Sequence, residues 1–190
     1  MTTAFDTGSL VVISAGAGEP CPTRLLADRI AESVCRSLAA RGEVVELEVI
    51  ELRRLATDLA RHSAQGHTSL DLCEAIAAVA AADGLVVATP LVAASPSEVF
   101  ESFFDVLEDG VLSGTPVVLA ATCRSRRRLP DVGQVMRGRL ARSHAEPVPT
   151  VVVASAEDWE GSADDSRQLR DRIDHAAAEL AAVMGSRRHS

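Results

Sequence analysis

The chain has 190 residues, a net charge of −8 and a hydrophobic fraction of 47%, which is enough apolar sequence for one sizeable domain. All 19 basic residues are arginine, so no mechanism can use a lysine amine. The negative charge argues against binding to nucleic acid or to an anionic membrane surface. No apolar run approaches the roughly 20 residues that a membrane-spanning helix needs.

The four cysteines, Cys21, Cys35, Cys73 and Cys123, show no paired spacing. We therefore expect neither a disulfide framework nor a zinc site, and the histidines show no metal-binding spacing either. Cysteines without a disulfide framework are typical of a reducing compartment, so we expect a cytoplasmic protein. Residues 1–9 lack a basic stretch followed by an apolar one, so no signal peptide is expected.

The N-terminal half alternates between short apolar runs and amphipathic stretches. A run rich in β-branched residues is typical of a buried parallel strand, and proline suits the first position of a helix. An apolar stripe at helical spacing indicates a helix that packs by one face. We expect a strand at 10–15, a helix at 22–42, a half-exposed strand at 44–52 and a helix at 69–82. The polar stretch 53–68 is not assigned to a helix or a strand.

The C-terminal half continues the same alternation. Ser97 is a suitable cap for a helix that carries Phe100, Phe103 and Phe104 at helical spacing, so these rings are expected in the core. We expect strands at 84–88, 115–121 and 149–155, helices at 97–107 and 162–184 with a further helix after an arginine-rich segment, and a frayed tail at 185–190.

Five strands that alternate with helices predict an α/β fold, with a doubly wound parallel sheet and helices on both faces. The whole chain, 1–190, is expected to form one domain with its core at about 10–184. Such sheets bind ligands outside the carboxyl ends of their strands. The loops expected there are 14–23, 89–97 and 121–130.

The first loop is the candidate for binding a phosphate. Ser14, Gly16 and Thr23 offer hydroxyls and free backbone, Pro22 starts the helix, and Arg24 adds a full charge. Unpaired N–H groups at a helix start attract anions. The loop matches neither GxxxxGK[ST] nor GxGxxG, so an ordinary turn before a helix remains the alternative.

The second and third loops differ in chemistry. Small residues such as Ala93 and Ser95 let a flat ring approach the backbone, and the loop carries no acid before Glu98. The third loop holds Cys123, Arg124 and three further arginines at 126–128. These arginines could hold a dinucleotide phosphate or an acidic partner, or form a solvated basic surface.

Three segments, SAGAGEPCPTRLLAD at 14–28, AAADGLVVATPLVAASPSEVFESFFDVL at 80–107 and PVVLAAT at 116–122, resemble the NADPH-dependent FMN reductase family. The likeness is closest to an actinobacterial branch, which the DW at 158–159 also fits. The resemblance implies a flavodoxin-like fold with strand order 2-1-3-4-5 and FMN at the carboxyl edge. It also implies NADPH or NADH as hydride donor, a homodimer or homotetramer, and a monooxygenase as possible recipient of reduced flavin.

The resemblance also assigns residues. Ser14, Thr23 and Arg24 match the phosphate-binding segment, residues 90–93 and Ser95 match the loop beside the flavin ring, and Thr122 begins the loop that closes over it. No catalytic side chain is expected, because the cofactor carries the chemistry. The cofactor-binding candidates are Ser14, Gly16, Pro22, Thr23, Arg24, Pro90, Leu91, Val92, Ala93, Ser95, Thr122, Cys123 and Arg124.

The same loops depart from the family pattern. Pro96, Ser97 and Glu98 replace an aromatic residue, a small residue and glycine, and Glu101 stands where a lysine is usual. The glycine pair after Thr122 is replaced by cysteine and arginine. The leading hypothesis is an NAD(P)H-dependent FMN reductase. The alternatives are a flavodoxin-like protein that has lost FMN and serves as a binding or assembly partner, and a thiol-based redox protein that uses the cysteines at 21 and 123.

Overall fold

The computed structural model describes residues 7–93, 95–125 and 131–188. Strands and helices alternate along most of the chain, as the sequence predicts. In chain order the elements are β1 (Gly8–Ser14), α1 (Pro22–Ala39), β2 (Val45–Glu51), α2 (Leu52–Gln65), α3 (Leu70–Ala80), β3 (Gly84–Val92), β4 (Ser95–Pro96), α4 (Glu98–Val106), β5 (Pro116–Cys123), α5 (Val132–Leu140), β6 (Glu146–Pro147), β7 (Val152–Ser155), α6 (Ala156–Glu160) and α7 (Ala163–Arg188).

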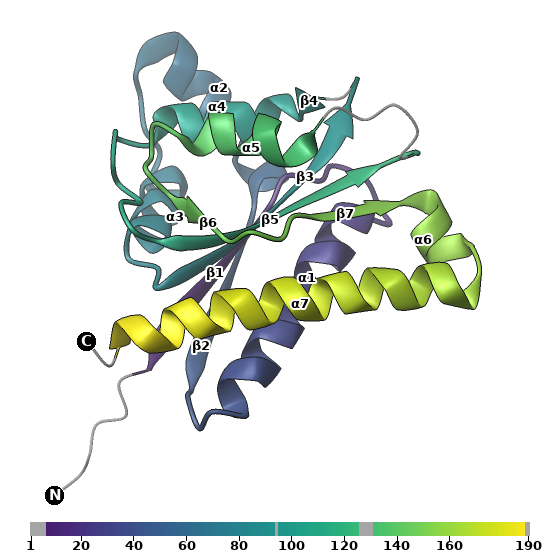
Figure 1. Ribbon diagram of the computed structural model, residues 1–190. Coiled ribbons are helices and arrows are strands. Elements are labelled where there is room, and N and C mark those ends of the chain that lie inside the picture. Colours follow the sequence, from purple (N-terminus) through teal and green to yellow (C-terminus); the bar gives the residue numbers. More distant parts are fainter. Residues whose placement is uncertain (1–6, 94, 126–130, 189–190) are drawn as a thin grey trace, which may run out of the picture.

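The sheet lies between two layers of helices (Figure 1). Its strands run in the order β2-β1-β3-β5-β6, and all of these neighbours are parallel. This confirms the predicted flavodoxin-like order, although the sheet has seven strands rather than five. Strand β4 adds an antiparallel hairpin to the end of β3, and β7 pairs in parallel with the second half of β5.

The predicted fifth strand, 149–155, is observed only as β7, which covers its last four residues, and the two-residue strand β6 precedes it; both pair with β5. Between them the chain leaves the ladder, and its carbonyl oxygens turn to Arg137 instead. The Arg137 guanidinium donates to the carbonyls of Pro147, Val148 and Pro149 at 2.9–3.2 Å. Because proline lacks an N–H group, two prolines in this short stretch prevent a continuous strand.

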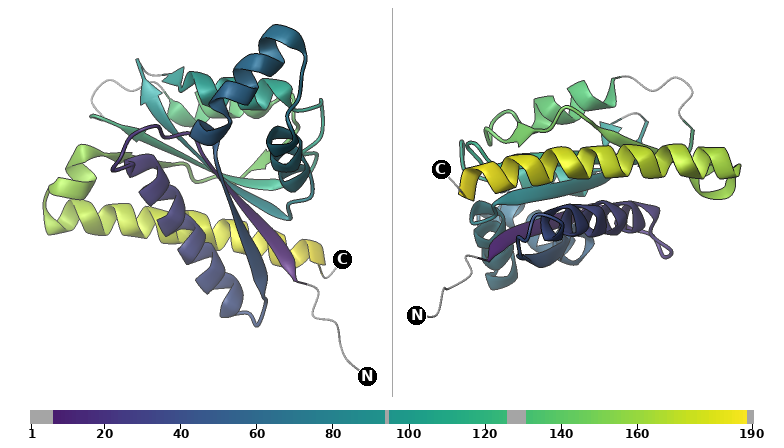
Figure 2. Two further views of the ribbon diagram at one scale, coloured as in Figure 1. Left: turned by 180° about the vertical axis from the view of Figure 1, so that it is seen from behind. Right: turned by 60° about the horizontal axis from the view of Figure 1, so that its bottom comes forward.

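The strands are buried on both faces, because successive side chains point to opposite sides of the sheet. Val11 and Ile13 pack into the core under α2, α3, α4 and α5. Leu10 and Val12, on the same strand, pack into the second core with α1 and α7. Figure 2 shows α1 and α7 crossing each other on this second face.

The closing helix is longer than predicted. It continues to Arg188, so the expectation that the tail frays from residue 185 is wrong for the described part. Met184 is fully buried, and the Arg187 guanidinium donates to the carbonyl of Gly114. Earlier in the helix, the carbonyl of Ala181 accepts a hydrogen bond from Arg41 at 3.2 Å. These contacts hold the last turns against the neighbouring elements.

The unassigned stretch 53–68 contains most of α2, which starts directly after β2. Leu52, Leu55 and Leu59 are buried on one face of this helix, and Gly66 ends it with φ +68°. A left-handed φ at this position favours glycine and closes the last turn. Within the described ranges, no helix is both long and apolar enough to cross a bilayer.

Candidate active site

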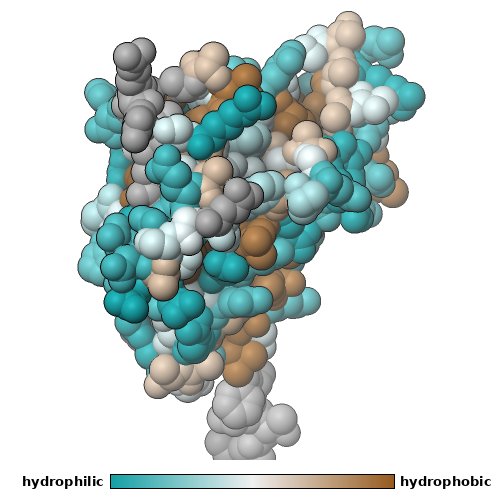
Figure 3. Space-filling view, turned by 90° about the vertical axis from the view of Figure 1, so that its right-hand side faces the viewer, coloured by the Kyte–Doolittle hydropathy of each residue, from teal (hydrophilic) through white to brown (hydrophobic). Residues whose placement is uncertain are grey.

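A cleft of about 730 Å³ opens at the carboxyl edge of the sheet, where the ends of β1, β3 and β5 meet helix α1. Figure 3 looks onto this edge of the molecule, where apolar patches lie among polar side chains. The three predicted loops and α6 build the walls. The cleft is lined by Gly16, Ala17, Gly18, Pro20, Cys21, Pro22, Thr23, Leu25, Pro90, Leu91, Thr122, Cys123, Arg124, Ala156 and Trp159.

The first wall is the loop before α1 and the start of that helix. Cys21 is the N-cap, and its Sγ accepts from the backbone N–H of Arg24 at 3.4 Å. Pro22 is at the first helical position. Among the described residues, the backbone N–H groups of Gly16 and Gly18 have no hydrogen-bond partner. These groups are available for an anion.

Gly16 allows the loop to close tightly over the helix start. A Cβ at this position would collide with Sγ of Cys21 and would lie 2.9 Å from Cβ of Thr23. A side chain here would therefore force the cap or the helix start to move. The glycine of the predicted phosphate loop thus has a defined steric role.

The second wall is the end of β3. Pro90 and Leu91 line the cleft, but Val92, Ala93 and Ser95 do not. The chain forms a β-hairpin here instead of the expected loop, with Leu91 opposite Pro96 and Val92 opposite Ser95. Val92 is 65% exposed at its tip, and Ala93 turns the chain with φ +50°.

Two predicted phosphate ligands are absent from the cleft lining. Ser14 is 2% exposed at the end of β1, inside the sheet. Arg24 belongs to the first turn of α1, yet its guanidinium pairs with Asp28 at 2.7 Å and with Glu51 at 2.9 Å. Both partners lie outside the cleft lining, so the charge of Arg24 is directed to these carboxylates.

The third wall is the end of β5. Thr122 and Cys123 line the cleft, and Sγ of Cys123 donates to the carbonyl of Ala154 at 3.7 Å. Arg124 is exposed, and among the described lining residues it carries the one full charge. The other loop arginines, at 126–128, lie outside the described residues.

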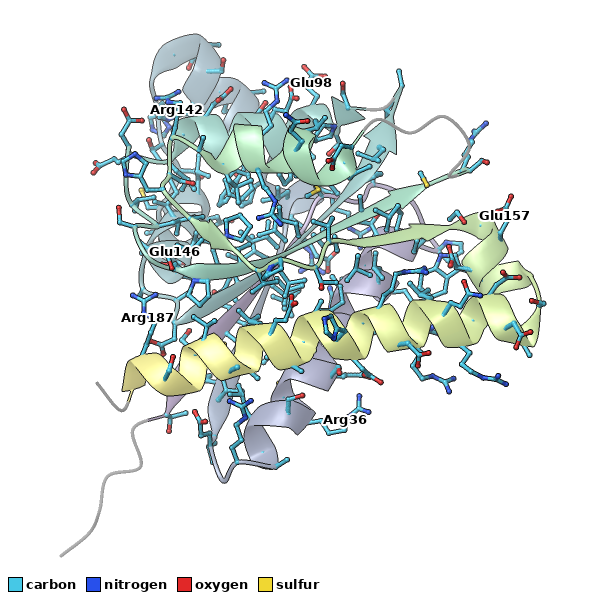
Figure 4. All side chains as sticks on the ribbon, in the orientation of Figure 1. Arg36, Glu98, Arg142, Glu146, Glu157 and Arg187 are labelled. Atoms are coloured by element: carbon cyan, nitrogen blue, oxygen red, sulfur yellow. The ribbon has the colours of Figure 1, made fainter. Side chains whose placement is uncertain are left out.

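The acidic departures from the family pattern lie outside the cleft lining. Glu98 is exposed in the first turn of α4 (Figure 4). Glu101 forms an ion pair with Arg139 of α5 at 2.9 Å. The carboxylate that replaces the usual lysine therefore faces an arginine, and neither acid lines the cleft.

The fourth wall, α6, was not predicted as part of the site. Trp159 lines the cleft, and the guanidinium carbon of Arg29 lies 4.7 Å from the centre of its ring. Asp158 holds α6 in place, because its carboxylate accepts from the backbone and hydroxyl of Ser155 and pairs with Arg172 at 2.9 Å. The DW pair was visible in the sequence, but nothing local indicated that α6 returns to the edge of the sheet.

The four cysteines occupy different places in the fold. Cys21 and Cys123 both line the cleft, whereas Cys73 is exposed on α3. Burial raises the pKa of the Cys35 thiol, which packs at the second core. No cluster of three or more potential ligands from His, Cys, Asp and Glu occurs within the described part of the chain.

The model of one protein family, described as NADPH-dependent FMN reductase, matches residues 9–160. This match covers all strands of the sheet and all walls of the cleft. The chain belongs to the NADPH-dependent FMN reductase family. It is accordingly an oxidoreductase that uses FMN, with NADPH or NADH as the electron donor.

Individual relatives agree with this family. The FMN reductase (NADPH) of Pseudomonas aeruginosa is 28% identical over 187 residues, which are 98% of this chain and 96% of the relative. The NADH-dependent FMN reductase SfnF of Pseudomonas putida is 30% identical, over 78% of this chain and 77% of the relative. A solved oxidoreductase of Corynebacterium diphtheriae superposes with a TM-score of 0.89 at 38% identity, covering 95% and 98% of the two chains.

Proposed function

We propose that the cleft at the carboxyl edge is the site where this FMN reductase binds flavin and nicotinamide. The observation that carries the proposal is the combination of unpaired loop N–H groups with mostly apolar walls in one cleft of about 730 Å³. Phosphate-bearing ring ligands need both features, because one end is anionic and the other is flat and apolar. When bound, FMN supplies the hydride acceptor.

The loop at the start of α1 is the proposed phosphate end. The N–H groups of Gly16 and Gly18 and the helix N-terminus favour a phosphate there. Thr23 contributes a hydroxyl that already bonds to Thr122. In this assignment Ser14 has a structural role, and Arg24 does not contact the ligand in the arrangement described above.

The ring end is proposed to lie against Pro90, Leu91 and the end of β5. Pro90 and Leu91 offer carbon surface and backbone, and hydride transfer to a flavin requires no side-chain acid or base. Arg124 is the proposed contact for a phosphate of the nicotinamide dinucleotide, because it is exposed at the rim and has no ion-pair partner among the described residues.

The alternative of a protein that has lost FMN binding receives less support. It rested partly on Glu98 and Glu101, and neither of these side chains lines the cleft. Cys123 and Arg124 do line it, but the cleft remains open beside them. The thiol-based alternative has only the shared position of Cys21 and Cys123 in its favour.

We further propose that reduced flavin passes to a partner monooxygenase, and that the protein is a cytoplasmic homodimer or homotetramer. The exposed apolar tip of the β3–β4 hairpin supports a subunit contact near the cleft, because Val92 is 65% exposed there. Sedimentation of the purified protein, with and without Val92→Asp, tests this contact. A monomeric wild type would contradict it.

The decisive experiment is a titration of flavin-stripped protein with FMN by calorimetry, followed by assays of NADPH and NADH oxidation. We expect a Kd of about 1 μM or tighter, which corresponds to roughly −8 kcal/mol. Gly16→Ala should weaken binding at least about tenfold, because the new Cβ displaces the loop. Gly138→Ala is the matched control, since nothing lies within 4 Å of a Cβ there. No binding to the wild type at hundreds of micromolar would refute the proposal.

A further inference from the structure

A network of ion pairs borders the phosphate end of the cleft. Its centre is Glu51, the last residue of β2, which is in register with Ser14 at the end of β1. Three guanidinium groups reach its carboxylate: Arg24 at 2.9 Å, Arg53 at 2.7 Å and Arg54 at 3.3 Å. The Glu51 side chain is only 14% exposed, so these contacts are partly shielded from water.

Arg24 is the arginine of this network whose two neighbours in the sequence line the cleft. Its neighbours Thr23 and Leu25 both line the cleft, but Arg24 does not. Its Nη1 donates to Glu51 and its Nε donates to Asp28, whereas Nη2 has no hydrogen-bond partner among the described residues. The positive charge of Arg24 therefore lies beside the phosphate end of the cleft, but it is paired with the carboxylates of Asp28 and Glu51.

The network also reaches the loop itself. Arg53 bridges Glu51 and Glu19, at 2.7 Å and 2.8 Å, and Glu19 belongs to the loop between β1 and α1. The first turn of α1 contains no acidic residue. The first turn of the helix therefore brings no negative charge against an external anion, and the acid of the loop, Glu19, is paired with Arg53.

We propose that Glu51 is a positioning residue that limits the affinity of the cleft for phosphate-bearing flavins by holding Arg24 away from the bound phosphate. The inference rests on the proposed function, because it assumes that FMN occupies this cleft. A phosphate and the Glu51 carboxylate compete for the same guanidinium. While Glu51 holds it, backbone N–H groups and hydroxyls bind the phosphate without a full opposing charge, and the flavin leaves more easily.

Glu51 is ionised at neutral pH, so its ion pair with Arg24 is present under these conditions. The hydrogen bond from Arg53 keeps the pKa of Glu51 below its usual range, and the nearby charges of Arg53, Arg54 and Arg24 act in the same direction against the opposing effect of burial. Glu51 is therefore ionised at neutral pH, and a substitution is needed to remove its contact with Arg24.

The test compares FMN with riboflavin, which lacks the phosphate, on the full-length protein. Glu51→Gln should tighten FMN binding about threefold to tenfold and leave riboflavin binding unchanged. Added salt should reduce the gain, because the released interaction is electrostatic. Glu46→Gln is the matched control, because Glu46 is exposed on the same strand and its substitution removes the same charge. It should change neither affinity.

A second substitution separates positioning from simple support of the fold. In the Glu51→Gln and Arg24→Gln double variant, the gain in FMN affinity should disappear. If Glu51→Gln does not fold, Asp28→Asn releases Nε of Arg24 and should give a smaller gain of the same kind. Equal changes for both flavins, or a gain that survives Arg24→Gln, would overturn the inference alone. A wild type that binds neither flavin would overturn the proposed function together with it.

Discussion

Oγ1 of Thr23 and Oγ1 of Thr122 lie 2.7 Å apart, although 99 residues separate them in the sequence. Thr23 is 2% exposed and Thr122 is 8% exposed, so each hydroxyl depends on the other for a partner. This hydrogen bond joins the first turn of α1 to the carboxyl end of β5. Two of the cleft walls are therefore held at a fixed distance from each other before any ligand binds.

The first prediction concerns this hydroxyl pair. Thr23→Val or Thr122→Val alone should lower the free energy of unfolding by about 1–2 kcal/mol, because one buried hydroxyl loses its partner. The double variant should be less destabilised than the sum of the two, by about 1 kcal/mol. Urea unfolding of the four proteins measures this coupling. Strict additivity would show that the hydroxyls do not interact in solution.

The strands could be predicted because they are short apolar runs that can be read directly, whereas their order was implied by the resemblance to the family. Leu10–Ile13 and Gly84–Ala88 have no polar side chain that would permit exposure on either face. The ends were less predictable. Strand β3 continues through Pro90 into a hairpin, because Leu91 pairs with Pro96 and Val92 pairs with Ser95, only a few residues later in the chain. A small-residue loop and such a hairpin have the same composition.

The cleft was predictable as three loops but not as a set of contacts. Gly16, Thr23 and Thr122 line one cleft, because parallel strands end at one edge of the sheet. Arg24 does not line it, since the direction of its side chain depends on Glu51, which is 27 residues away. The wall that contains Trp159 was missed for a similar reason: it depends on where α6 packs after the last strand.

The second prediction uses the single tryptophan of the chain. Because the chain has one Trp and no Tyr, its intrinsic fluorescence reports on Trp159 alone, at the cleft wall. FMN should quench this emission with the same Kd that calorimetry gives. Trp159→Phe should remove the signal and keep the binding within a few-fold, since an aromatic ring remains. Binding by calorimetry without quenching would place the flavin away from α6.

The third prediction concerns the thiol that caps α1. Cys21→Ala removes the acceptor for the N–H of Arg24 and should lower the free energy of unfolding by about 0.5–1 kcal/mol. Cys21→Ser should be at least as stable as the wild type, because a hydroxyl is a better cap than a thiol. Cys73→Ala, on the exposed face of α3, should have no measurable effect. A loss for the serine variant equal to that for alanine would show that packing against Gly16 matters more than the cap.

The last prediction follows from the lowered pKa of Glu51. A carboxyl group whose folded-state pKa lies below its unfolded value stabilises the fold above the unfolded pKa, and this contribution is lost as the pH falls through the folded-state pKa. Urea unfolding from pH 7 to pH 3 should therefore show wild type more stable than Glu51→Gln above about pH 5, with the difference shrinking below about pH 4.3. For Glu46→Gln, whose side chain is exposed, the difference from wild type should stay small and nearly constant. If the Glu51 difference does not shrink in acid, the three arginines contribute through packing of their side chains and not through the charge of Glu51.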